Sequence, residues 1–211
     1  MEQDKNLIKI NEFIKEDSSL RKECNFCNES KLDLGSLTKY GARVIYKFGD
    51  SVQNQWFVTI SPKTGGDIEK DFTILLAPVQ HITHFSQISN YPELSKNYGI
   101  AFAKINNVIL KIMADKKEFN SIELTKENAI SVGTYGKSTN WKDKKEHLHI
   151  KIFPFKGVIG QPYTVDSSFS KKEIYEDENI EKFIKMKPVY KKLIPNKRFD
   201  ELLENFIQLL K

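Results

Sequence analysis

The segment from His147 to Phe153 constrains the fold of this chain more than any other. Leucine and isoleucine alternate along it with two histidines and a lysine, and strict alternation predicts a half-buried β-strand. Successive side chains of a strand point to opposite faces, so we expect His147, His149 and Lys151 to share one face. A strand that only turns a polar face to solvent would give the same pattern, and the spacing alone leaves both interpretations open.

The imidazoles of this strand suggest a chemical role. Two of the chain's four histidines lie here. Near neutral pH, a neutral imidazole can bind a metal ion, act as a general base or attack phosphorus. Beside the positive charge of Lys151, two imidazoles predict a surface that binds anions.

The other two histidines and the only two cysteines suggest a metal site. Cys24 and Cys27 form a CxxC motif near the N-terminus, and His81 and His84 follow an apolar, strand-like run. Two thiolates and two imidazoles are a ligand set that tetrahedral zinc prefers. A CxxC motif also occurs in redox pairs, but no thioredoxin-like βαβ pattern surrounds this one, so the sequence favours zinc.

Five short motifs occur in the order in which the histidine triad (HIT) superfamily carries them, and the chain resembles that family over about residues 22–155. The motifs cover residues 24–27, 56–62, 72–82, 133–138 and 147–151. The resemblance implies an α+β fold, in which a HIT-like antiparallel sheet packs with one long helix and a nucleotide binds beside the histidine strand. It also implies a nucleotidyl hydrolase or transferase in which His149 attacks the α-phosphate and forms a covalent intermediate.

The resemblance assigns the first histidine of the strand to zinc, as in relatives that carry a CxxC motif. The implied ligands are Cys24, Cys27, His81 and His147. A set of four protein ligands is closed to water and therefore structural. We prefer His81 to His84 because the Pro-x-x-His position carries the family match, and His84 is the alternative.

The resemblance also implies phosphate-binding groups near the nucleophile. Lys151 is one candidate, and the glycine-flanked segment before the histidine strand supplies Gly136, Lys137 and Ser138. Glycine lets a backbone approach a phosphate closely. We expect this segment and Lys151 to contact the phosphates of the substrate.

Two further candidate binding residues depart from the family pattern. Ser131 stands where an asparagine commonly precedes the glycine-rich loop. Thr59 stands where relatives hold an acidic or amide residue for the ribose hydroxyls, and a neutral hydroxyl bonds more weakly than a carboxylate. These departures bear on the substrate more than on the fold.

A second interpretation is a nucleotide- or nucleic-acid-binding module with a decayed active site. Lys151 stands where the hydrolase branches carry a third histidine and the uridylyltransferase branch carries glutamine. Lys142, Lys144 and Lys145 precede the histidine strand, next to Trp141. They predict either a solvated loop or a clamp for a polyphosphate or nucleic-acid extension of the substrate.

Length and composition suit one domain with an extension. The chain has 211 residues, and 39% of them are hydrophobic, so it can bury a sizeable core. No apolar run approaches the roughly 18–20 residues that span a bilayer, and the first residues do not resemble a signal peptide. With two cysteines and no disulfide framework, we expect a cytoplasmic protein without a membrane partner. The net charge of +5 favours anionic ligands in general.

Hydrophobic periodicity predicts the remaining elements. Strands are expected at residues 43–48, 56–60, 73–77, 121–124 and 146–155, and helices at residues 5–16, 92–116, 171–177, 180–186 and 199–210. We therefore divide the chain into an N-terminal helical segment (1–21), a HIT-like domain (22–155) and a C-terminal helical extension (156–211). We expect the last helix, capped by Asn196 or a neighbour, to pack on the domain, and a homodimer contact is the alternative.

Overall fold

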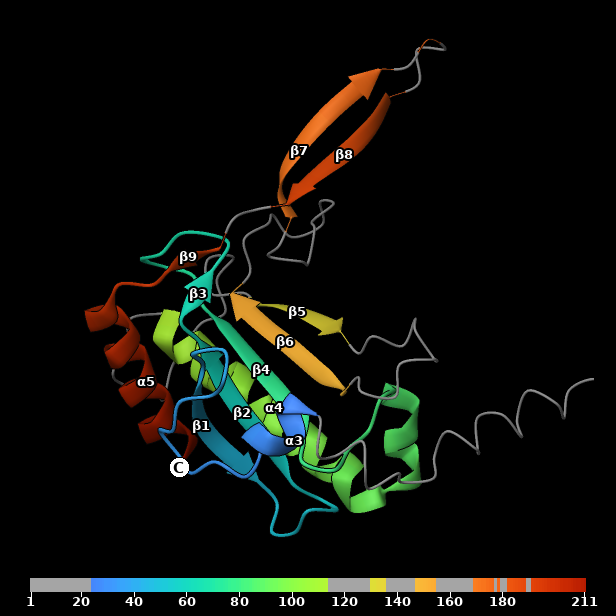
Figure 1. Cartoon of the computed structure of the whole chain (residues 1–211), viewed down its shortest axis with the longest axis vertical. Helices are drawn as coiled ribbons and strands as arrows, with labels where there is room; N and C mark the ends of the chain where they lie inside the picture. Colours follow the sequence, from blue (N-terminus) through green and yellow to red (C-terminus); the bar gives the residue numbers. More distant parts are fainter. Residues whose placement is uncertain are drawn as a thin grey trace, which may run out of the picture.

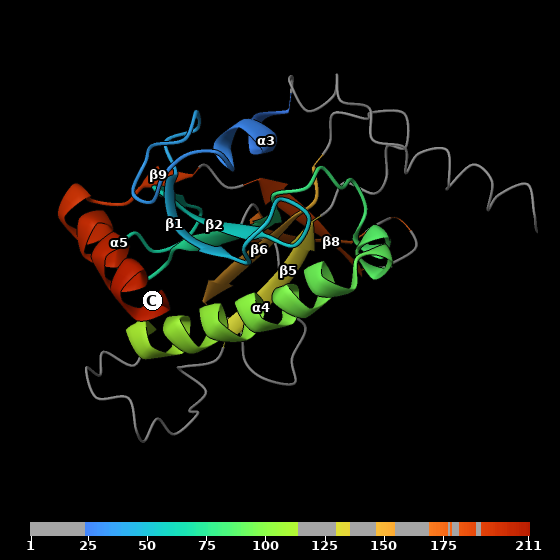
Figure 2. The same cartoon turned by 90° about the horizontal axis from the view of Figure 1, so that it is seen from below.

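The computed structural model describes residues 24–113, 130–135, 147–154, 169–176, 178, 182–188 and 191–211. A five-stranded antiparallel sheet with strand order β1-β2-β4-β6-β5 forms the centre of the molecule (Figure 1). Its strands are β1 (Arg43–Phe48), β2 (Trp56–Ser61), β4 (Thr73–Pro78), β5 (Ile130–Tyr135) and β6 (His149–Pro154). Figure 2 shows the long helix α4 on one face of this sheet and the short helix α3 on the other. The fold is therefore α+β, as predicted.

The predicted strands at residues 43–48, 56–60 and 73–77 are confirmed, each within one residue at either end. The turn between β1 and β2 depends on Gly49, whose φ is 100°. A Cβ at this position would lie 2.7 Å from the backbone oxygen of Asn54, so glycine is required there. The Asn54 side-chain oxygen accepts the backbone N–H groups of Asp50 and Ser51 and closes the turn.

Helix α4 (Pro92–Met113) supplies one layer of the hydrophobic core. It begins at Pro92 as predicted, because proline suits the first turn of a helix and an apolar stripe follows it. Its buried residues, Leu94, Ala101, Ile105, Val108 and Ile109, belong to the same core cluster as buried residues of β2, β4 and β6. The opposite face of the sheet carries α3 and the candidate site.

The C-terminal helix α5 (Asn196–Leu210) packs on the domain, as predicted, and contacts α4 and β1. Its Phe206 is fully buried and meets the Phe72 ring edge-on. The short strand β9 (Lys192–Leu193) precedes it and pairs with β3 (Lys63–Thr64). The helix was predicted from residue 199 with Asn196 or a neighbour as its cap; it begins earlier, at Asn196, and the neighbouring Pro195 takes the cap position without a side-chain hydrogen bond.

The helices predicted at residues 171–177 and 180–186 are wrong. The structure has an antiparallel hairpin there, formed by β7 (Phe169–Glu176) and β8 (Lys182–Pro188) and standing away from the central sheet (Figure 1). The register pairs Ile174 with Ile184 and Tyr175 with Phe183. Pairs of aromatic and β-branched residues on neighbouring strands favour a hairpin. A helical pattern within one seven-residue segment does not show this pairing, because the two paired residues lie on different segments.

Two of the predicted elements, at residues 5–16 and 121–124, lie outside the described residues. The helix expected to reach residue 116 is described only as far as Met113. Across the described part of the chain, no helix combines the length and apolar character needed to cross a membrane.

Candidate functional site

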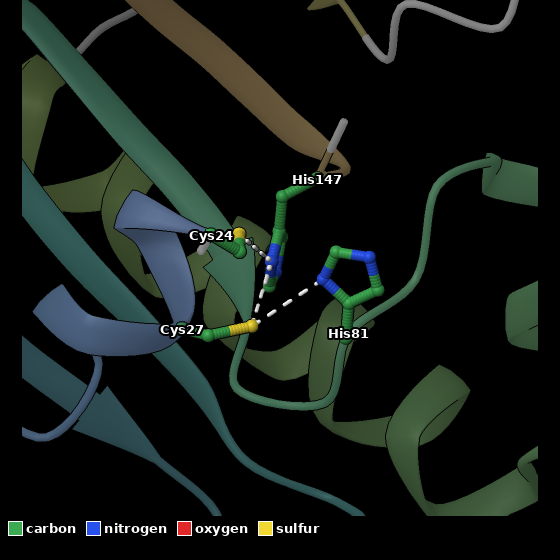
Figure 3. A group of neighbouring side chains, drawn as sticks. All are labelled: Cys24, Cys27, His81 and His147. Carbon is green, nitrogen blue, oxygen red and sulfur yellow. Dashed lines mark hydrogen bonds between the residues drawn. The ribbon is translucent and has the colours of Figure 1, made fainter. Parts of the chain in front are cut away.

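Four side chains from three separate segments meet beside the sheet (Figure 3). Cys24 and Cys27 flank the start of α3 (Asn25–Glu29), His81 follows β4, and His147 precedes β6. One ligand atom from each residue lies within 4.8 Å of all the others. The structure thus brings the four predicted ligands together as a candidate metal site, although they span more than 120 positions of the chain.

The separations between these ligand atoms fit a small tetrahedral ion. The Nδ1 atom of His147 lies 3.4 Å from the sulfur of Cys24 and 3.5 Å from that of Cys27, and His81 Nδ1 lies 3.3 Å from Cys27. With usual zinc bond lengths, tetrahedral geometry separates neighbouring ligand atoms by about 3.3–3.8 Å. The site is therefore consistent with zinc in both donor chemistry and size.

The sulfur of Cys24 is in an environment that favours the metal-binding thiolate form. Cys24 and Cys27 are 3% and 5% exposed. The pKa of the Cys24 thiol is held well below its usual range, chiefly by a hydrogen bond from Cys27 and further by His147 and His81, although burial acts in the opposite direction. A thiol that loses its proton easily is a better metal ligand, because binding requires the thiolate.

His147 is oriented by a second hydrogen bond on the far side of its ring. Its Nε2 atom lies 2.7 Å from the carbonyl oxygen of Pro78, the last residue of β4. A carbonyl oxygen only accepts, so Nε2 carries a proton, and Nδ1 is the ring nitrogen that faces the two sulfurs and can bind a metal ion. Such a hydrogen bond on the other ring nitrogen is the usual support of a metal-binding histidine.

His84, the alternative ligand, has a different structural role. It caps the 3-10 helix η1 (Phe85–Asn90), where its Nδ1 accepts the backbone N–H of Ser86. The Gln87 side chain in turn accepts the backbone N–H of His84, which completes a capping box. The structure therefore supports the choice of His81 over His84.

His149 lies next to the metal site but outside the four-residue cluster. It is the first residue of β6, which starts later than the predicted residue 146, because Leu148 donates its N–H to Ile82 and not to a neighbouring strand. His147 therefore precedes the strand instead of lying in it, but its ring and the His149 ring both contact the ring of Phe26, so the two imidazoles lie on the same side as predicted. His149 and Lys151 do share a face, because they are two residues apart on β6.

The tautomer of His149 follows from one contact. Its Nδ1 lies 3.0 Å from the carbonyl oxygen of His147. Because that oxygen only accepts, Nδ1 carries the proton, and in the neutral ring Nε2 is then the nitrogen with a lone pair. Nε2 is therefore the atom of His149 that can act as a nucleophile.

Thr59 and Lys151 lie in one row across this face of the sheet. The register pairs Thr59 with Leu75, and Leu75 with Lys151, which in turn pairs with Gly133. Adjacent strands are about 4.8 Å apart, so the Thr59 and Lys151 backbones are separated by about 10 Å. Thr59 is nearly fully buried, and Lys151 is partly exposed.

The structure describes only one of the four remaining predicted binding residues. Ser131 lies on β5, at the edge of the sheet, where the register pairs it with Phe153. Gly136, Lys137 and Ser138 lie outside the described residues, as do the lysines of residues 142–145 and Trp141.

Phe26 is a site residue that the sequence analysis missed. Its ring stacks on the His149 ring with a centroid distance of 5.1 Å and an interplanar angle of 20°. It also lies 5.5 Å from the His147 ring. The only available signal was its position between the two cysteines. In the backbone register, Tyr135 of β5 pairs directly with His149.

No family model, curated protein or solved structure matches this chain. The resemblance to the HIT superfamily therefore stays a prediction that rests on motif order.

Proposed function

We propose that this chain is a nucleotidyl hydrolase or transferase that cleaves a nucleoside phosphate ester, anhydride or phosphoramidate through a covalent nucleotidyl-His149 intermediate. The observation that carries the proposal is the hydrogen bond between His149 Nδ1 and the carbonyl oxygen of His147. It leaves Nε2 as the unprotonated nitrogen, which is the state that attack on phosphorus requires. The order of the HIT-like motifs supports the same conclusion.

The reaction has two steps. First, the Nε2 lone pair forms a bond to the α-phosphorus, and the bond from phosphorus to the leaving group breaks with its electron pair. The leaving group takes up a proton from solvent. Then the oxygen of water or of an acceptor hydroxyl attacks the same phosphorus and releases its proton to solvent, while the bond to Nε2 breaks with its electron pair and regenerates the neutral imidazole. Lys151, on the same strand face, offers a positive charge to the phosphate oxygens in both steps.

The proposal includes one structural zinc ion held by Cys24, Cys27, His81 and His147. Support comes from the donor set, the ligand separations and the Pro78 contact of His147. Four protein ligands leave no coordination position for water, so this ion would support the fold and would not act on the substrate. It would fix His147, whose carbonyl oxygen in turn orients His149.

Trapping of the intermediate tests the nucleophile. Native protein is incubated with nucleotides that carry a radiolabel at the α-phosphate, and acid-labile label on the protein is measured. We expect label on the native protein and none on His149→Ala. The matched control is His84→Ala, the same substitution at a histidine outside the site, which should keep the label. Equal labelling of native protein and His149→Ala would exclude His149 as the nucleophile.

A nucleotide- or nucleic-acid-binding module is the second candidate, and Lys151 is the observation that favours it. A lysine in place of a third histidine keeps a positive charge but lacks a group that titrates near neutral pH. The same experiment separates the two functions. Nucleotide binding without label or turnover would favour the module, whereas label that decays with product release would favour the enzyme.

A further inference from the structure

Phe26 connects the candidate metal site to His149. It belongs to α3, the five-residue helix that carries Cys27 and begins directly after Cys24. So short a helix is not stable by itself, and α3 also lacks a side-chain cap and acidic residues in its first turn. Its position must come from packing and from the two cysteines that flank Phe26. The location of the Phe26 ring therefore depends on the four-residue site.

The Phe26 ring constrains His149 in a way that a hydrogen bond does not. The bond from Nδ1 to the His147 carbonyl fixes the tautomer, but the imidazole can still tilt about that bond. The stacked Phe26 ring, at an interplanar angle of 20°, covers one face of the imidazole and limits this tilt. On its other sides Phe26 meets His147 and the buried Phe57, which keep it in place.

These two contacts of His149 both lead to the metal ligands. One passes through the backbone of His147, and the other through the ring between Cys24 and Cys27. We infer that Phe26 is a positioning residue that transmits the occupancy of the metal site to the ring plane of His149. Metal binding would then control the nucleophile without touching the substrate. The catalytic part of this inference rests on the proposed function, but the structural coupling does not.

The coupling can be measured without any substrate. The protein is labelled with ¹³C at histidine Cε1, which gives four signals for its four histidines, and single substitutions assign them. The ring current of a stacked phenyl group shields a proton above its face. Phe26→Leu should therefore move the His149 signal downfield while the zinc content stays at one per chain. The signal of His84, which caps η1, should not move.

Matched variants separate loss of the ring from loss of stability. Phe26→Tyr keeps an aromatic ring and should retain the native His149 signal. Phe85→Leu is the same substitution at an exposed phenylalanine that contacts Tyr98, and it should leave the His149 signal unchanged. Zinc removal from native protein should move the His149 signal in the same direction as Phe26→Leu, and removal from Phe26→Leu should add little. If the apoprotein unfolds, the turnover of zinc-loaded Phe26→Leu still tests whether Phe26 positions His149.

Activity provides the second measurement. A shifted nucleophile lowers turnover more than substrate binding, so kcat of Phe26→Leu should fall between about tenfold and a hundredfold while KM changes less than about twofold. An unmoved His149 signal in zinc-loaded Phe26→Leu would overturn the inference. An unmoved His149 signal after zinc removal from folded native protein would overturn it as well. If both signals move but native protein neither turns over nor labels with any nucleotide, the coupling stands and the proposed function fails.

Discussion

At the scale of single residues, the two histidines after β4 have different structural roles, although they lie only three positions apart. His81 presents Nδ1 to the sulfur of Cys27, whereas His84 accepts the N–H of Ser86. Motif position alone favoured His81 in the sequence, and no local pattern could show that His84 is a helix cap. The roles follow from contacts made by the folded chain.

Substitution of each histidine by alanine should distinguish the metal ligand from the helix cap. We expect His81→Ala to lose zinc, because three ligands remain of a closed set of four. His84→Ala should keep one zinc per chain and lose about 1 kcal/mol of stability, the usual cost of a lost cap. Elemental analysis and denaturant unfolding measure the two effects. Zinc loss in His84→Ala, with His81→Ala unaffected, would reverse the assignment.

At the scale of elements, sequence patterns predicted those parts that depend on local periodicity. Strand β1 has the predicted bounds and α4 starts at Pro92, because the hydrophobic pattern that predicted each element lies within its own residues. The β7–β8 hairpin was missed, since its backbone register pairs residues such as Ile174 and Ile184 that lie on different segments, and no short window contains both. Residue type indicated a site of two cysteines and two histidines, and motif order selected His81 and His147 for it, but nothing in the sequence predicted that Phe26 stacks on His149.

Helix α3 is the element that should respond first to metal removal. Its few backbone hydrogen bonds include the one from the Asn28 N–H to Cys24 and the one from the Ser30 N–H to Phe26. Too short to persist alone, it should lose hydrogen-exchange protection when a chelator removes zinc. The buried turns of α4, such as those around Ile105 and Ile109, should keep theirs. If α3 stays protected in zinc-free protein, the metal does not hold this helix.

At the scale of the whole molecule, the segment at residues 191–211 adds buried residues to the hydrophobic core that the sheet and α4 share. Strand β9 pairs with β3, and α5 then packs across α4 and β1. Four buried residues of α5 join the same hydrophobic cluster as α4 and the central strands: Phe199, Leu202, Phe206 and Leu210. This part of the predicted extension therefore shares its core with the sheet, and we expect the two to unfold together.

Phe206→Ala tests this shared core. The Phe206 side chain is fully buried against Phe72, so its truncation should cost about 3–5 kcal/mol through lost burial and a cavity. The matched control is Phe85→Ala, whose ring is 41% exposed and which should cost much less. Denaturant unfolding followed by tryptophan fluorescence measures both values, in a Trp141→Phe background that leaves Trp56 as the only tryptophan. The buried Trp56 donates a hydrogen bond to the Leu94 carbonyl of α4 and so reports on the sheet and that helix. A single transition at lower denaturant for Phe206→Ala would show that α5 and the sheet form one cooperative unit, whereas an unchanged Trp56 transition would show that α5 unfolds separately.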